Sequence, residues 1–145
     1  MKLQISRCLL LFGFLFVAPP GFAEEALRAF WALDYGDGSA NQYHFEQRSK
    51  DAAVSFRYVP VRPEESSTGM YSGGEPRQGR LTAKQVRELK RRLAELESDA
   101  ALRVEERGKG TGAFTVQTPE GTRSFLIRMG PEIRRFDEFL KKLGS

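Results

Sequence analysis

Histidine and cysteine are nearly absent from this chain. Its 145 residues include one histidine, His44, and one cysteine, Cys8. A histidine-based zinc site or a cysteine–histidine dyad needs a second such residue, so the sequence argues against both kinds of enzyme. A Gly-x-Ser-x-Gly elbow, a phosphate loop and a dinucleotide fingerprint are also missing. We therefore predict no catalytic residue, no bound metal and no cofactor.

His44 is the remaining candidate for acid–base chemistry. It lies between Tyr43 and Phe45 in a strand-like pattern, which is typical of a surface residue or a hydrogen-bonded sheet residue. The acidic residues offer no better candidate, because Glu105 and Glu106 are adjacent and would point to opposite faces of a strand. An enzyme would need polar residues that converge in a pocket. No motif predicts such a pocket, so we expect a protein that is not an enzyme.

Long apolar runs are missing too, apart from one near the N-terminus. Leu9 to Val17 form this run, Lys2 and Arg7 precede it, and Gly21-Phe22-Ala23 follows with small residues where a signal peptidase reads. The run is shorter than the roughly 20 apolar residues that span a bilayer. We predict that residues 1–23 are a signal peptide and that the protein is exported to the periplasm or the extracellular space.

The alternative is an uncleaved membrane anchor. Pro19, Pro20 and Gly21 would break a helix at the cleavage site, which favours cleavage before Glu24 and leaves no transmembrane segment. No lipid-attachment pattern leads into Cys8, so we do not interpret it as a lipoprotein cysteine.

Cleavage would leave residues 24–145 as one domain with little net charge. Removing 23 of the 145 residues leaves 122, and the formal charge falls from +4 to +2 because Lys2 and Arg7 are lost. The remaining chain has no cysteine, so packing rather than disulfide bonds must stabilise it.

Period-two patterns predict three strands in the first half. Apolar side chains alternate with polar ones over residues 26–35, 41–47 and 52–61. Turn residues connect these segments at Gly36–Ser39 and Arg48–Asp51. The short connections favour an antiparallel meander.

A helix is predicted from Thr82 to about Glu97. Thr82 and Gln85 have the spacing of a capping box. The next apolar residues recur at intervals of three and four, which places one narrow stripe against a core. The stripe consists of Val86, Leu89, Leu93 and Leu96.

The second half repeats this scheme. Strands are expected at residues 101–107, 113–118 and 123–129, with Phe125, Ile127 and Met129 on one face. The glycines of residues 108–112 favour a hairpin turn over a phosphate site, because a strand and not a helix follows them.

A proline–glycine hairpin and a closing helix complete the pattern. Pro119 and Gly121 are typical of a tight hairpin, and Gly130-Pro131 opens a last helix that Gly144 ends. The inward side of this helix consists of Ile133, Phe136, Phe139, Leu140 and Leu143. The expected order is β-β-β-α-β-β-β-α, an α+β fold in which two amphipathic helices pack on an antiparallel sheet of about six strands.

Basic residues gather around the first helix but do not predict nucleic-acid binding. Acidic residues interleave with them, and a charged helix face usually serves solubility, so we do not expect nucleic acid as a partner. An anionic surface of the cell envelope is equally compatible. The basic set is Arg77, Arg80, Lys84, Arg87, Lys90, Arg91 and Arg92.

A Gly/Ser-rich loop is predicted at residues 62–80. Its glycines and prolines argue against a regular element anywhere in SSTGMYSGGEPRQGR, residues 66–80, yet Met70 and Tyr71 lie at its centre. These two side chains could form a short edge strand on the sheet, which we favour, or project as an anchor for a partner. The candidate partner-binding residues are Met70, Tyr71, Ser72, Gly73, Gly74, Arg77 and Arg80.

The order of these segments resembles that of the emfourin-type inhibitors of thermolysin-like metallopeptidases. Ser72-Gly73-Gly74, the region 81–97 and the region 131–143 carry this resemblance over about half of the expected mature chain. It implies a small α+β protease inhibitor. In that family, Ser-Gly-Gly tends to run into an aromatic residue near the start of the domain, whereas here Glu75-Pro76 follows it.

The sequence as a whole predicts a small, exported, non-enzymatic binding protein whose partner it does not identify. A protease inhibitor is the first alternative and requires a rigid exposed loop that can enter a cleft. A structural factor of the cell envelope is the second, and requires an exposed apolar face or a self-association surface.

Overall fold

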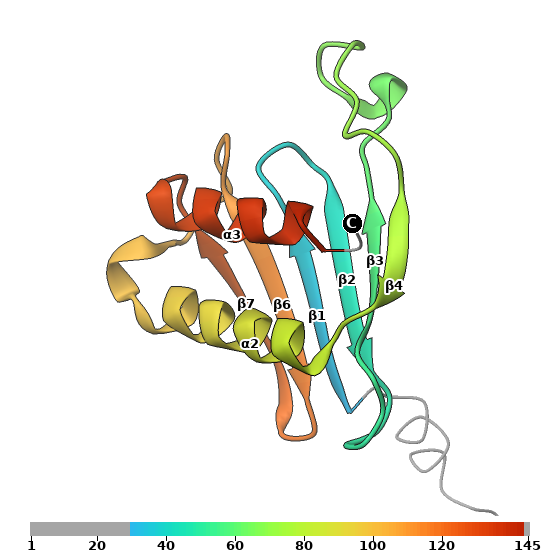
Figure 1. Ribbon diagram of the computed structural model, residues 1–145. Coiled ribbons are helices and arrows are strands. Elements are labelled where there is room, and N and C mark those ends of the chain that lie inside the picture. Colours follow the sequence, from blue (N-terminus) through green and yellow to red (C-terminus); the bar gives the residue numbers. More distant parts are fainter. Residues whose placement is uncertain (1–29, 144–145) are drawn as a thin grey trace, which may run out of the picture.

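The structure is a computed structural model that describes residues 30–143, so the expected signal peptide and its cleavage site lie outside the described residues. Two helices pack on one face of a seven-stranded antiparallel sheet with strand order β4-β3-β2-β1-β6-β7-β5 (Figure 1). The expected α+β class and helix placement are confirmed, with one strand more than the sequence suggested. No helix within the described range is long and apolar enough to cross a membrane.

The elements follow the expected order along the chain. The strands are β1 (Trp31–Gly36), β2 (Gln42–Gln47), β3 (Ser55–Val59), β4 (Arg77–Arg80), β5 (Arg103–Val104), β6 (Gly112–Thr118) and β7 (Gly121–Ile127). The helices are α2 (Ala83–Ser98) and α3 (Pro131–Lys141), with short 3-10 turns η1 (Pro63–Glu65) and η2 (Ala100–Leu102).

Aromatic side chains fill the space between the sheet and α3. Tyr35 on the central strand β1 stacks on Phe114 of β6 with ring centroids 4.5 Å apart. It also meets the edge of Phe136 from α3 at 5.2 Å. All three residues are at most 2% exposed. Such pairs add about 0.5–1.5 kcal/mol beyond the burial of their surface, so this cluster fixes α3 on the sheet.

The start of α2 is the one that the sequence predicted. The Thr82 hydroxyl accepts from the Gln85 backbone N–H at 3.2 Å, and the Gln85 side chain accepts from the Thr82 N–H at 2.8 Å. Leu89, Leu93 and Leu96 are buried against the sheet, which confirms the apolar stripe.

Three local expectations were wrong. Residues 77–80 are not loop but the edge strand β4, paired with β3. The glycine-rich residues 108–112 do not form a hairpin between neighbouring strands, because β5 pairs with β7 and not with β6. Met129 is 59% exposed, since β7 ends at Ile127 and the alternation stops there. The hairpin between β6 and β7 is confirmed, with Thr118 opposite Gly121.

The face of the sheet away from the helices is polar. In register across it lie Asp34, His44 and Arg57, with Thr115 on the other side of Asp34. His44 Nδ1 is 2.6 Å from Asp34 Oδ1, so His44 is a hydrogen-bonded sheet residue. The other neighbour of His44 in register is Arg57 and not a serine. This row of side chains therefore lacks the serine that a serine–histidine–aspartate catalytic triad requires.

Candidate functional site

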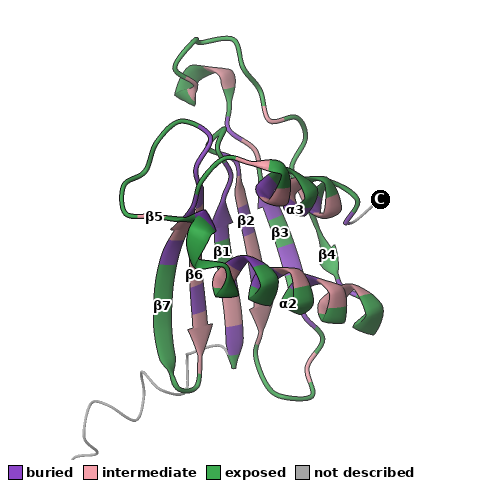
Figure 2. Cartoon of the chain, turned by 90° about the vertical axis from the view of Figure 1, so that its left-hand side faces the viewer, coloured by how far each residue is buried: buried purple, intermediate pink, exposed green. Residues whose placement is uncertain are grey.

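Residues 62–76, called the projection below, extend beyond the end of the sheet between β3 and β4 (Figure 1). Figure 2 shows that this segment is mostly exposed, and none of its residues is buried. Met70 is 83% exposed, the highest value among the large exposed hydrophobic side chains of the described chain. The projection therefore presents an apolar side chain to the solvent far from the core.

The base of the projection is held by hydrogen bonds around Gly73. The Gly73 N–H donates to the Val61 carbonyl at 3.0 Å, and the Tyr58 hydroxyl donates to the Gly73 carbonyl at 2.6 Å. A Cβ atom at position 73 would lie 1.9 Å from Asn41 Oδ1 and 2.8 Å from Pro60 Cβ. Only glycine fits there, because the chain passes directly against the β1–β2 turn.

Ser66 ties the two halves of the projection together. Its hydroxyl donates to the Pro63 carbonyl at 2.9 Å and accepts from the Tyr71 N–H at 3.3 Å. The Tyr71 hydroxyl in turn accepts from Asn41 Nδ2 at 3.2 Å. These bonds restrain the chain on both sides of Met70 although no apolar core surrounds it.

The seven candidate partner-binding residues do not form one surface. Met70 projects, and Tyr71 bonds to the β1–β2 turn while remaining 42% exposed, so neither forms the edge strand that we favoured. Arg77 Nη1 donates to the carbonyls of Lys141 and Leu143 and so fastens the end of α3. Arg80 lies on the polar face of the sheet. Ser72 and Gly74 are exposed beside the anchored Gly73.

A cavity of about 400 Å³, called the base cavity below, lies between the base of the projection and α3. The β1–β2 turn, the loop before β6 and one side of α3 form its other walls. Its polar lining residues include Asp37, Asn41, Tyr43, Tyr58, Tyr71, Lys109, Arg134, Asp137 and Lys141.

Asp37 and Asn41 form a buried, fully bonded wall of the base cavity. The Asp37 carboxylate accepts from Ser39 N at 2.8 Å, Asn41 N at 2.9 Å and Asn41 Nδ2 at 2.8 Å. Asn41 Oδ1 accepts from Val61 N at 3.0 Å. Every donor to Asp37 is neutral, so its negative charge has no ion-pair partner among the described residues.

Asp137 of α3 contributes a second carboxylate. The Tyr35 hydroxyl donates to Asp137 Oδ1 at 2.6 Å. Burial is the main cause that raises the pKa of Asp137 to about 6, and the nearby charge of Asp37 adds to it, against the opposing effects of Tyr35 and Lys141. Burial and Asp137 also raise the pKa of Tyr35, which therefore stays a hydrogen-bond donor.

Two glycine-containing turns contribute to the wall of the base cavity. A Cβ atom on Gly38 would lie 2.3 Å from the Gly110 Cα, and Gly110 has a φ of 78°. Gly110 therefore allows close packing against the β1–β2 turn, whereas Gly112 packs against Ile133 and Tyr35. This packing takes the place of the hairpin that the sequence suggested.

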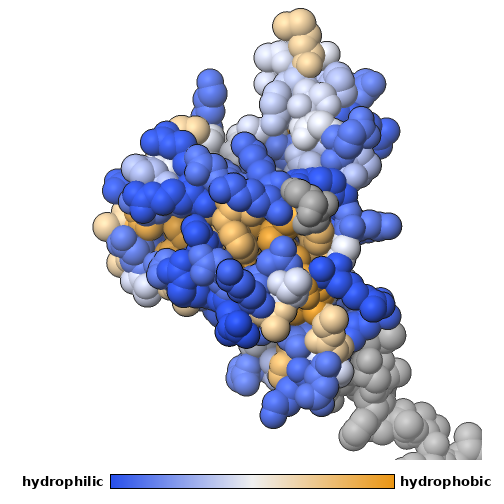
Figure 3. Space-filling model, in the orientation of Figure 1, coloured by the Kyte–Doolittle hydropathy of each residue, from blue (hydrophilic) through white to orange (hydrophobic). Residues whose placement is uncertain are grey.

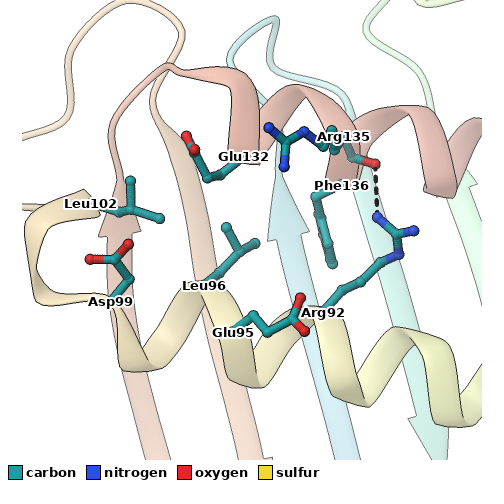
Figure 4. A pocket seen from close by; sticks show the side chains of 8 residues that line it. All are labelled: Arg92, Glu95, Leu96, Asp99, Leu102, Glu132, Arg135 and Phe136. Carbon is teal, nitrogen blue, oxygen red and sulfur yellow. Dashed lines mark hydrogen bonds between the residues drawn. The ribbon is translucent and has the colours of Figure 1, made fainter.

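A second, smaller cavity of about 180 Å³ lies between the helices. Figure 3 shows an apolar stripe between α2 and α3, and Figure 4 shows Leu96, Leu102 and Phe136 lining the cavity with charged residues around them. Arg92 donates to the Arg135 carbonyl at 3.4 Å across this cavity. Its contacts explain how the two helices are held together.

Most of the basic residues around α2 are engaged in contacts. Arg91 and Arg92 both bond to Glu88 at 2.7 Å, and the bond from Arg91 is the largest cause that lowers the pKa of Glu88 to about 2. Lys90 lies over the Trp31 ring at 4.8 Å. These contacts agree with a solvated helix face and give no further reason to expect nucleic acid as a partner.

Sequence reasoning missed the polar residues of the base cavity. Asp137 had one usable signal, because it lies within the apolar stripe of α3 between Ile133 and Leu140, where a carboxylate is unusual. Asp37 and Asn41 carried only the ordinary signal of a turn. No described group of histidine, cysteine, aspartate and glutamate residues could hold a metal ion.

The chain matches no protein-family model, no curated protein and no solved structure.

Proposed function

We propose that this protein is an exported, non-enzymatic binding protein and that the projection is its contact with a protein partner. The observation that carries the proposal is an 83% exposed Met70 in a segment fixed at its base by Gly73 and braced by Ser66. A preorganised segment loses less conformational entropy when it binds, and a flexible methionine adapts well to an apolar pocket.

The base cavity gathers polar groups, as an enzyme would require, yet its chemistry favours binding. Asp37 and Asn41 are saturated by hydrogen bonds that build the walls. His44 lies on the sheet face away from the helices. Among the described residues, this leaves Asp137 without a histidine or cysteine beside it for acid–base or nucleophilic work.

Site-specific photo-crosslinking in the native cells tests the contact. A photoreactive amino acid is placed at position 70 and, as the matched control, at position 129, whose methionine is exposed outside the projection. We expect a discrete adduct from position 70 that position 129 does not give. The absence of an adduct at position 70, or the same adducts from both positions, would refute the contact.

A protease inhibitor is the second candidate, because an exposed segment restrained on both sides of Met70 meets the requirement for a loop that enters a cleft. The test is titration of a thermolysin-like metallopeptidase with the purified protein. Inhibition at a stoichiometric ratio, weakened at least tenfold by Met70→Ser, supports this candidate. Rapid cleavage between residues 66 and 74 without inhibition would instead make the projection a substrate.

The structural-factor alternative gains less support. The open face of the sheet carries charged and hydroxyl side chains such as Asp34, Arg57 and Thr115, and the large exposed apolar residues are scattered. Scattered apolar residues are normal on a soluble surface and do not form a self-association patch.

A further inference from the structure

The lining of the base cavity contains a polar group that the fold itself does not use. Tyr43 is 2% exposed and lines the cavity, and its hydroxyl has no hydrogen-bond partner among residues 30–143. The hydroxyl group itself is not fully buried, so it opens into the cavity, where it can bond to water or to a ligand. By contrast, the hydroxyls of Tyr35, Tyr58 and Tyr71 are all bonded within the protein.

Two carboxyl groups supply negative charge to the lining of the base cavity. Asp37 is 9% exposed and carries a charge that no described cation pairs with. Asp137 uses only Oδ1 to accept from Tyr35, which leaves Oδ2 able to accept a hydrogen bond.

Exposed basic side chains supply positive charge to the lining of the same cavity. Lys109, Arg134 and Lys141 line the cavity, are all exposed, and form no ion pair within the described chain. A purely cationic ligand would be repelled by these three side chains, and a purely anionic one by the two carboxylates. A ligand with both charges can pair with the carboxylates and with the basic side chains.

We propose that the base cavity is a binding site for a small zwitterion of the α-amino-acid type. Its ammonium group would donate to Asp137 and to the Tyr43 hydroxyl, and its carboxylate would accept from Arg134 and the exposed lysines of the lining. A volume of about 400 Å³ lies within the range of small-molecule sites. This site is separate from Met70 and does not depend on the proposed protein contact.

Nuclear magnetic resonance titration of the intact protein with each of the 20 free L-amino acids tests the site. Methylamine and acetate serve as single-charge controls. We expect saturable shifts at Tyr43, Gly110 and Asp137 with at least one amino acid, and much weaker binding of both controls. Tyr43→Phe, which keeps the ring, should weaken binding about tenfold, as expected for one lost bond to a charged group. Asp137→Asn should weaken it further.

Two control variants separate this site from other surfaces. Arg134→Gln should weaken binding, whereas Arg87→Gln, on an exposed position of α2 that does not line the cavity, should not. Met70→Ser should also leave amino-acid binding unchanged. The site is refuted if no amino acid binds, if acetate or methylamine binds as tightly, or if Tyr43→Phe and Arg134→Gln both bind like the wild type.

Discussion

In the sheet and its two helices, large apolar side chains fill the space between the layers, whereas in the projection a few hydrogen bonds hold the chain. Tyr35, Phe114 and Phe136 are at most 2% exposed, and no residue of the projection is buried. The first region derives its stability from burial and the second from contacts at its base. A substitution in the sheet or its helices should therefore change the free energy of unfolding. A substitution at Met70 should instead change the binding of a partner.

The largest expected effect is the loss of a core aromatic ring. Phe136→Ala removes a ring that packs on both Tyr35 and Phe114, and it should lower the free energy of unfolding by about 3–5 kcal/mol. Urea denaturation followed by circular dichroism measures this loss. A variant as stable as the wild type would show that α3 does not depend on this cluster.

Gly73→Ala tests whether the base of the projection is as tightly packed as the core. The new methyl group would collide with Asn41 Oδ1, so we expect a loss of about 1–3 kcal/mol in the same denaturation experiment. Gly79→Ala is the matched control, because a Cβ atom there meets only the Phe56 ring at 3.6 Å. Equal stability of the two variants would contradict the close packing at Gly73.

The free energy of unfolding should depend on pH through Asp137. Its pKa of about 6 lies above the ordinary value of 3.8, so the fold favours the protonated form. The resulting stabilisation is complete below about pH 4 and is lost as the pH rises through 6. We expect an effect on the order of 1 kcal/mol, because the carboxyl is partly exposed.

Asp137→Asn provides the comparison for this effect. The amide oxygen can still accept from Tyr35, but the side chain no longer titrates. Urea denaturation of both proteins between pH 4 and pH 8 should show the wild type losing stability relative to the variant as pH rises. A difference that stays constant across this range would mean that Asp137 has an ordinary pKa.

The smallest expected effect is that of Met70→Ser on stability. The side chain is 83% exposed and touches no core, so the free energy of unfolding should change by less than about 0.5 kcal/mol. The measurement is again denaturation in urea. A loss of 2 kcal/mol or more would mean that Met70 packs against the sheet or its helices and cannot be an exposed anchor.

The sequence predicted those elements whose apolar residues repeat, and it missed those held by distant contacts. The stripe from Leu89 to Leu96 and the capping box at Thr82 are local patterns, and both were right. β4 has no such pattern. Its residue Arg77 faces the helices through its contacts with Tyr58 and with the end of α3, so an arginine occupies a position where an apolar residue would have indicated a strand.

The candidate site was harder to predict for the same reason. Met70 and Tyr71 stood out because they are large apolar residues among glycines, and Met70 proved to be exposed. The base cavity instead joins Asp37 to Asp137 across 100 residues of sequence. Only the unusual position of Asp137 within an apolar helix stripe hinted at it, and a single sequence does not reveal which loops meet that stripe.

The central position of β1 also has a consequence for how the chain acquires its structure. β1 pairs with β2 through a short turn, but its other edge pairs with β6, about 80 residues later. Until Gly112 and the residues after it are synthesised, that edge of β1 has no partner strand. Leu33 and Tyr35 then lack the side chains of β6 that lie beside them in the folded sheet. Unpaired apolar edges promote aggregation, and such distant pairings form slowly. Fragments that end before β6 should therefore aggregate rather than fold as a smaller domain.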